Sequence, residues 1–159
     1  LVELMTPAEQ KELLDNDVVR NIMDRVIHSS VAGDAGCVAE LGDVESKEMI
    51  FDITALVKYQ KYVATEGFSW YLKNIKADRL SSDAFANLYA LVIKEGSAPK
   101  KLAVRMPATV SLRSGWSADS ISVVTSACNS MAGHIQHDAG TVVIGPKGSW
   151  LISDPGYQQ

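Results

Sequence analysis

The chain has 159 residues and a net charge of −4, with 47% hydrophobic and 21% charged residues. These values are typical of one globular domain with a single core, and the negative charge gives nucleic-acid binding no electrostatic support. Apolar runs such as residues 121–124 are far too short to cross a bilayer, so we expect no membrane span. The only cysteines, Cys37 and Cys128, do not make a disulfide framework, and whether they pair or remain thiols stays open.

The first 98 residues carry helical patterns. Residues 6–16 begin with a predicted capping box, in which Thr6 caps the helix, Pro7 takes its first position and Glu9 follows three residues after the cap. Residues 15–30 then predict a second helix, which ends near His28, a residue that we expect to be structural. Its apolar stripe has helical spacing. The stripe consists of Val18, Val19, Ile22, Met23, Val26 and Ile27.

The glycine-containing segment 31–36 predicts a loop, and the segment 37–41 predicts a short helix with Cys37 at its start. Further helices are expected over 45–67 and 81–97, with a shorter helix or turn over 68–80. After residue 99 the pattern changes to short β-branched runs bounded by glycine or proline. Strands are therefore predicted within 101–107, 109–115, 141–145 and 149–153, whereas 117–133 is ambiguous between helix and strand. The order predicts an α+β fold in one domain over 1–159, helical over 1–98 and mainly β over 99–159.

Three residues in this arrangement fit the needs of a thiol hydrolase. A thiolate is favoured at a helix N-terminus, where Cys37 is expected. An imidazole must then hold and return the proton, and a third group must fix its orientation. His137 precedes the strand predicted at 141–145, and Asp154 follows the strand predicted at 149–153. The Pro-Lys-Gly turn between these strands makes them antiparallel neighbours, which would bring His137 and Asp154 to the same edge of the sheet.

The run HDAGTVVIGPKGSWLISDPG resembles the C-terminal half of papain-like cysteine peptidases, in the branch whose third catalytic residue is an Asp followed by Pro. That branch includes the bacteriocin leader peptidases and the cysteine-protease effectors and toxin domains of bacterial pathogens. The resemblance implies a papain-like fold, with an N-terminal helical part packed on a C-terminal antiparallel sheet. It also implies a catalytic triad with Cys37 as nucleophile, His137 as general base and acid, and Asp154 as the orienting residue, without a cofactor.

The same resemblance leaves two site residues open. His134 is an alternative to His137, because the segment Asp-Ala-Gly separates His137 from its strand. The family usually carries a Gln or Asn before the cysteine as an oxyanion donor, but this chain offers only Ser29, Ser30 or Asp34 there. The backbone N–H of Cys37 would then supply more of the oxyanion stabilisation.

We therefore expect a thiol-dependent amide hydrolase, a cysteine peptidase that acts on a protein or peptide through an acyl-enzyme. Glutamine deamidation and acyl or amide transfer on the same triad remain alternatives, as does a non-catalytic interaction module with a degenerate papain-like fold. A metal site formed by Cys128, His134 and His137 is a further alternative, although a fourth ligand is not evident. Because the chain begins with Leu, we expect a domain excised from a longer chain, either a secreted bacterial effector or toxin domain or a cytoplasmic protein.

Overall fold

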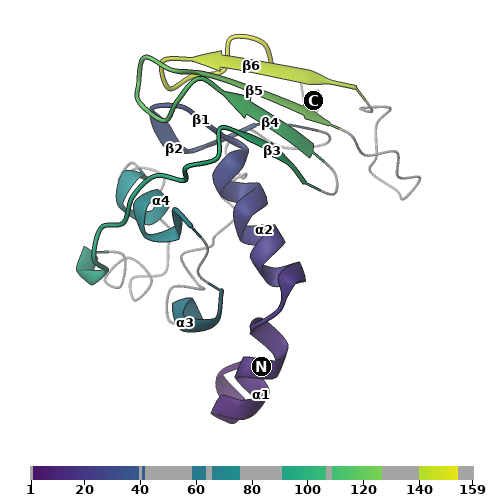
Figure 1. The fold of residues 1–159 in the computed structure, drawn as a ribbon, viewed down its shortest axis with the longest axis vertical. Coiled ribbons are helices and arrows are strands. Elements are labelled where there is room, and N and C mark those ends of the chain that lie inside the picture. The colour runs from purple at the N-terminus through teal and green to yellow at the C-terminus, as the bar shows by residue number, and fades with distance from the viewer. Residues whose placement is uncertain are drawn as a thin grey trace, which may run out of the picture.

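A computed structural model of the chain describes residues 2–39, 41, 59–63, 66–75, 91–106, 109–126 and 140–153. In this part of the chain, helices and antiparallel strands form an α+β fold, with the helices on one side of a sheet (Figure 1). The helices are η1 (Val2–Leu4), α1 (Pro7–Leu14), α2 (Asp17–His28), α3 (Gln60–Val63) and α4 (Phe68–Asn74). The strands are β1 (Ser30–Val31), β2 (Asp34–Val38), β3 (Ala103–Arg105), β4 (Thr109–Arg113), β5 (Ile121–Ser126) and β6 (Val142–Pro146).

The first two predicted helices are confirmed, together with the capping box. The Thr6 N–H donates to the Glu9 carboxylate at 2.7 Å, and the Glu9 N–H donates back to the Thr6 hydroxyl at 3.4 Å. Helix α2 begins after Asn16, whose side-chain oxygen accepts a hydrogen bond from the Val19 N–H at 3.0 Å. Both helix starts therefore follow from short polar side chains that satisfy unpaired backbone donors.

Only half of the predicted apolar stripe on α2 is buried. Met23, Val26 and Ile27 are at most 4% exposed, whereas Val18 is 69% and Ile22 is 47% exposed. The buried side chains of α2 join a hydrophobic cluster that also draws on α1, β2, α3 and α4. The segment predicted as a helix or turn at 68–80 forms helix α4 over Phe68–Asn74, and its residues 76–80 lie outside the described part of the chain. Helix α3 falls within the helix predicted at 45–67. Most of the helix predicted at 81–97 lies outside the described residues.

The loop predicted at 31–36 and the helix predicted from Cys37 are both wrong. Strands β1 and β2 form an antiparallel hairpin there, with Gly33 in its turn at a φ of 86°. A Cβ atom at Gly33 would lie 2.6 Å from the Ala118 Cα, so this close approach requires glycine. The hairpin is held by contacts from far along the chain, since the Ala32 N–H donates to the Ser122 hydroxyl at 2.8 Å. The local sequence pattern could not show that partner.

The C-terminal part is a four-stranded antiparallel sheet in the order β3-β4-β5-β6. Its register aligns Ser111 with Val124 and Val124 with Val143. The strands predicted within 101–107, 109–115 and 141–145 are confirmed, and the ambiguous segment 117–133 contains β5. The strand predicted at 149–153 is reduced to one bridge, in which Ile152 pairs with Ile144. No helix in the described residues is both long and apolar enough to cross a bilayer.

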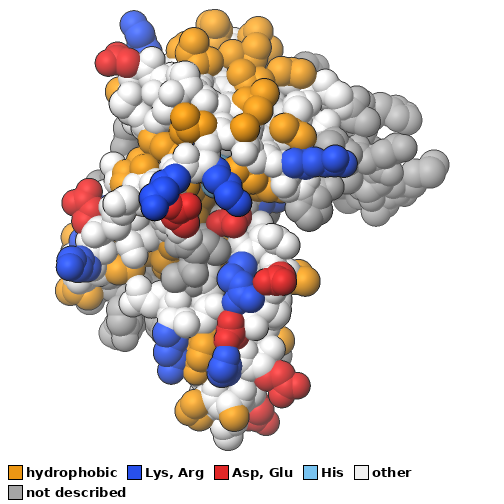
Figure 2. All heavy atoms as spheres, viewed as in Figure 1, with side chains coloured by type: hydrophobic (Ala, Val, Ile, Leu, Met, Phe, Trp, Pro, Cys, Tyr) orange, Lys and Arg blue, Asp and Glu red, His pale blue; other side chains and the backbone are white. Residues whose placement is uncertain are grey.

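The sheet has a polar buried face and an apolar outer face. The buried side chains facing the helices and the β1–β2 hairpin include Thr109, Ser111, Arg113, Ser122 and Ser126. The outer face exposes large apolar side chains, which gather over the sheet at the top of the molecule in Figure 2. They include Leu112, Ile121, Val142, Leu151 and Ile152.

Strand β2 connects two hydrophobic clusters. Its Ala35 and Val38 belong to the helical cluster, whereas Ala39, the residue after the strand, packs with Val124 and Val143 of the sheet. Among the described residues, α1 to α4 precede the four-stranded sheet as predicted, but the β1–β2 hairpin interrupts the helical part.

Candidate functional site

Cys37 lies within β2, one residue before the end of that strand, and its side chain is partly buried. The residue is therefore not at a helix N-terminus, which corrects the local structure expected from the sequence. Cys37 therefore does not lie in the first turn of a helix, where the unpaired N–H groups would favour its thiolate.

The two predicted partners of Cys37, His137 and Asp154, lie outside the described residues, as do His134 and Cys128. Residues 140–153, which lie between His137 and Asp154 in the sequence, are described and form a hairpin. The Ile144 N–H donates to the Ile152 carbonyl at 2.9 Å, and the Leu151 N–H donates to the Ile144 carbonyl at 2.8 Å. The predicted antiparallel return after the Pro-Lys-Gly turn is thus confirmed over these residues.

This hairpin is attached directly to β2. The Trp150 indole N–H donates to the Val38 carbonyl at 3.1 Å, and the Gly148 N–H donates to the Ala32 carbonyl at 2.9 Å. Gly145 makes the first contact possible, because a Cβ atom there would lie 2.7 Å from the Trp150 ring. The residue next to Cys37 is therefore bonded to the hairpin whose flanking sequence carries the predicted imidazole and carboxylate.

Of the polar candidates for an oxyanion donor, Ser30 is already engaged, since its hydroxyl donates to the Ile27 carbonyl at 2.7 Å. Asp34 is 1% exposed at the start of β2. Ser29, the residue after the end of α2, is also buried and lines a pocket that is described below. None of these three side chains is thereby identified as an oxyanion donor.

A buried polar cluster at the end of α2 was not expected from the sequence. The Arg113 guanidinium donates to the His28 carbonyl at 2.6 Å and to the Ser30 carbonyl at 3.1 Å, and it stacks 3.6 Å from the centre of the Trp116 ring. The Ser111 hydroxyl also donates to the His28 carbonyl, at 2.5 Å. The cluster satisfies the His28 carbonyl at the helix end and the Ser30 carbonyl of β1, and so stabilises the junction of α2 with β1.

Burial in this cluster changes the charge equilibria of two side chains. Burial, with repulsion from Arg113 as a smaller cause, lowers the pKa of the His28 imidazole to about 4. Burial likewise lowers the pKa of Arg113 to about 10, which still leaves the guanidinium charged at neutral pH. His28 is therefore neutral in the folded protein, consistent with the structural role expected for it.

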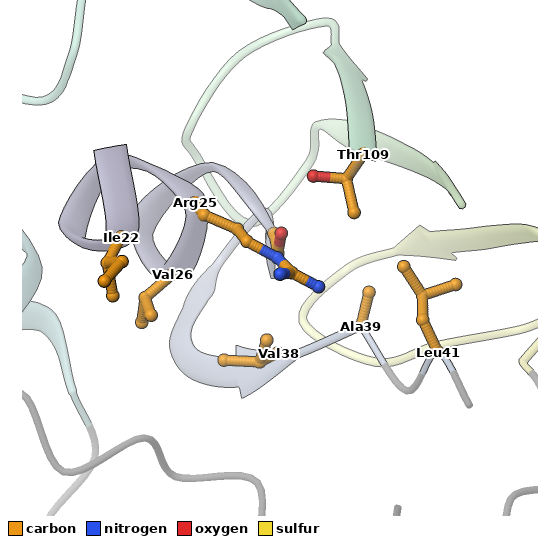
Figure 3. A pocket seen from close by; sticks show the side chains of 8 residues that line it. Ile22, Arg25, Val26, Val38, Ala39, Leu41 and Thr109 are labelled. Atoms are coloured by element: carbon orange, nitrogen blue, oxygen red, sulfur yellow. The ribbon is translucent and has the colours of Figure 1, made fainter. Parts of the chain in front are cut away.

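The second feature missed by the sequence is a pocket of about 220 Å³ between α2, the end of β2 and the start of β4 (Figure 3). It brings together residues that are far apart in sequence, and Ile22 and Arg25 resemble ordinary surface positions of a helix. The lining residues are Ile22, Arg25, Val26, Ser29, Val38, Ala39, Leu41 and Thr109. In the sequence, only the spacing of Ile22 and Arg25 on one side of the helix is compatible with such a pocket, and this spacing is common on helix surfaces.

Among the described residues, no group of three His, Cys, Asp or Glu side chains is arranged to hold a metal ion. The metal site considered for Cys128, His134 and His137 falls outside them. Comparison of the chain with protein-family models, with curated proteins and with solved structures finds no match to any of them.

Proposed function

We propose that the chain is a thiol-dependent amide hydrolase of the papain-like kind, with Cys37 as the nucleophile, His137 as the general base and acid, and Asp154 as the orienting residue. The supporting observation is the hydrogen bond from Trp150 to the Val38 carbonyl, which ties the strand of Cys37 to the hairpin of residues 140–153. His137 and Asp154 flank that hairpin in sequence, on the two chain ends that an antiparallel pair brings to one side.

In the proposed reaction, the Cys37 thiolate attacks the carbonyl carbon of a peptide or side-chain amide. The C–N bond then breaks, His137 gives its proton to the departing amine, and a thioester acyl-enzyme remains. Water attacks the thioester with His137 as general base, which releases the acid and restores the thiol. Asp154 holds the imidazole in the tautomer that these transfers require.

The position of Cys37 in a strand changes where the thiolate would find its stabilisation. Because Cys37 does not begin a helix, the proposal relies on the imidazolium form of His137 to stabilise the thiolate. Loss of His137 should therefore affect the reactivity of Cys37 itself, as well as the later proton transfers.

Alkylation of Cys37 tests this proposal directly. We expect iodoacetamide to alkylate Cys37 at pH 6.5 at least about tenfold faster than Cys128, with the rate falling by a similar factor in His137→Ala, because a thiolate and not a thiol is the nucleophile. Peptide mapping by mass spectrometry follows both cysteines in the same sample. His134→Ala is the matched control and should leave the rate unchanged.

The hydrolase proposal also requires that Cys37→Ala abolish turnover of amide substrates while the circular dichroism spectrum remains that of the wild type. Retention of turnover by this variant, or equal alkylation of the two cysteines, would contradict the nucleophile assignment. A rate that falls in His134→Ala instead would transfer the role of general base to His134.

A non-catalytic interaction module is the second candidate, favoured by the strand position of Cys37. In that case neither histidine variant alters alkylation, and Cys37→Ala changes nothing beyond packing. Deamidation or acyl transfer would share the acyl-enzyme of the first proposal and differ only in the amide attacked or in the nucleophile that resolves the thioester.

A further inference from the structure

We infer that the pocket between α2, the end of β2 and the start of β4 binds a small aliphatic carboxylate, with the carboxylate group on Arg25 and the hydrocarbon part against the apolar lining. Cys37 does not line this pocket, so the inference stands apart from the proposed hydrolase.

The lining sets the character of the ligand body. Five of the eight lining residues are aliphatic, and no acidic side chain is among the eight. The aliphatic ones are Ile22, Val26, Val38, Ala39 and Leu41. A pocket with mostly apolar walls and a few polar groups is the usual form of a small-molecule site, in which the polar groups fix the orientation of the ligand.

The volume sets the size of the ligand. An apolar cavity of about 150 Å³ holds one benzene molecule. By the same ratio, the 220 Å³ of this pocket would hold about nine non-hydrogen atoms. A short-chain fatty acid such as hexanoate is of this size, whereas a nucleotide or a folded peptide segment is too large.

Two hydroxyl groups in the pocket lack hydrogen-bond partners. Thr109 is 1% exposed and Ser29 is 5% exposed, and the side-chain oxygen of each makes no hydrogen bond within the part of the chain that the structure describes. A buried hydroxyl without a partner is unfavourable, and such groups are few in folded proteins. Both hydroxyls could donate to the oxygen atoms of a bound ligand.

Arg25 sets the charge of the ligand head group. Its side chain extends across the pocket, between Thr109 on one side and Val38 and Ala39 on the other (Figure 3). Arg20, on the same helix, forms salt bridges with Asp15 and Asp17, but Arg25 takes part in none of the salt bridges among the described residues.

A guanidinium offers two parallel N–H groups, which match the two oxygen atoms of a carboxylate. The same positive charge disfavours amines of equal size. A phosphate would present more charged oxygen atoms than one arginine and two hydroxyls can satisfy, which favours a carboxylate as the head group.

Isothermal titration of the full chain with hexanoate tests the inference, with hexylamine as a ligand of equal length and opposite charge. We expect saturable binding of hexanoate and at least about tenfold weaker binding of hexylamine. Arg25→Gln should weaken hexanoate binding at least about tenfold, and Thr109→Val, which keeps the side-chain shape, should weaken it about threefold or more. Arg20→Gln is the matched control on the same helix and should bind hexanoate as the wild type does.

Equal affinity for hexanoate and hexylamine, or unchanged hexanoate binding in Arg25→Gln, would overturn the inference. Ala39→Leu adds volume to the pocket lining without removing a charge and should also abolish binding. Because Ala39 is buried, the circular dichroism spectra of this variant and of Arg25→Gln are compared with that of the wild type to exclude altered folding. Cys37→Ala should bind hexanoate normally, so the failure of this inference and the failure of the proposed hydrolase are distinguishable.

Discussion

At the scale of single residues, Arg113 is a charged side chain whose role is to connect two elements of the fold. The side chain is 7% exposed, and its hydrogen bonds join the end of α2 to β1 through the His28 and Ser30 carbonyls. The Trp116 ring covers the guanidinium, and Trp70 and His28 pack against that ring in turn. Only Nη2 of the guanidinium donates these hydrogen bonds, while Nε and Nη1 have no partner among the described residues, so the stacking on Trp116 is the other interaction that stabilises the buried charge.

The stability of the protein should depend on pH through His28. Its pKa is about 4 in the folded chain and 6.5 in the unfolded chain, so the unfolded chain binds more protons between these values. The stabilisation is fully present above pH 6.5 and is lost as the pH falls toward 4. Between about pH 7.5 and pH 5, we expect the free energy of unfolding to fall by about 2 kcal/mol from this residue.

Urea denaturation of the wild type and of His28→Gln at both pH values measures this contribution. The glutamine variant keeps the backbone carbonyl that Arg113 and Ser111 bond, but it has no group that titrates in this range. Its free energy of unfolding should therefore change less with pH, by about 2 kcal/mol. If the free energy of unfolding depends on pH equally in the wild type and in His28→Gln, then folding does not keep His28 neutral.

At the scale of elements, the contact between β2 and the C-terminal hairpin depends on a glycine in β6. A Cβ atom at Gly145 would lie 2.6 Å from the Ser149 carbonyl and 2.7 Å from both the Trp150 ring and the Val31 side chain. No larger residue fits at Gly145 unless the backbone or the partly buried Trp150 ring moves, so the glycine in this strand is required by its neighbours in space.

Gly145→Ala should displace Trp150 from the Val38 carbonyl and destabilise the protein by about 2 kcal/mol, the usual range for overpacking. Thermal unfolding measures the loss, and the tryptophan emission spectrum reports the displacement. Gly115→Ala is the control, because a Cβ atom there meets chiefly the Ser120 hydroxyl, which can rotate away. An equal loss of stability in Gly145→Ala and Gly115→Ala would show that Trp150 is not closely packed against Gly145.

These elements also show what the sequence could and could not predict. Thr6 with Glu9, and the turn before Gly148, act through neighbours within a few residues, so their structures were predictable. The β1–β2 hairpin was not, because its support comes from Ser122 and Trp116, which are far away in sequence. For the candidate site, the pattern around the C-terminal hairpin predicted its antiparallel return, but not the contact of Trp150 with β2.

At the scale of the whole molecule, the inner face of the sheet is mainly polar apart from Val124 and Val143, whereas its outer face is mainly aliphatic. Alternation along β5 shows this clearly, since Val124 is fully buried between Ser122 and Ser126, while its neighbour Val123 lies on the outer face. The inner face of the sheet is therefore held by the apolar contacts of Val124 and Val143 together with hydrogen bonds, and much aliphatic surface remains on its outer face.

Val124→Ala should accordingly cost about 2 kcal/mol of unfolding free energy, because it leaves a cavity beside Ala39 and Val143. Val123→Ala removes the same atoms from the outer face and should cost less than about 1 kcal/mol. Chemical denaturation of the two variants gives both values. A larger loss for Val123→Ala would mean that the outer face is covered in solution.

The bonds of Ser111, Ser122 and Arg113 to α2 and the β1–β2 hairpin have a mechanical consequence. Hydrocarbon surfaces can slide over one another at little cost, whereas hydrogen bonds are directional and weaken steeply when their angles change. These hydrogen bonds therefore fix the orientation of the sheet relative to the end of α2. Since the pocket beside Arg25 lies between α2 and the start of β4, we expect these hydrogen bonds to keep its two sides in place, so that ligand binding requires little reorganisation there.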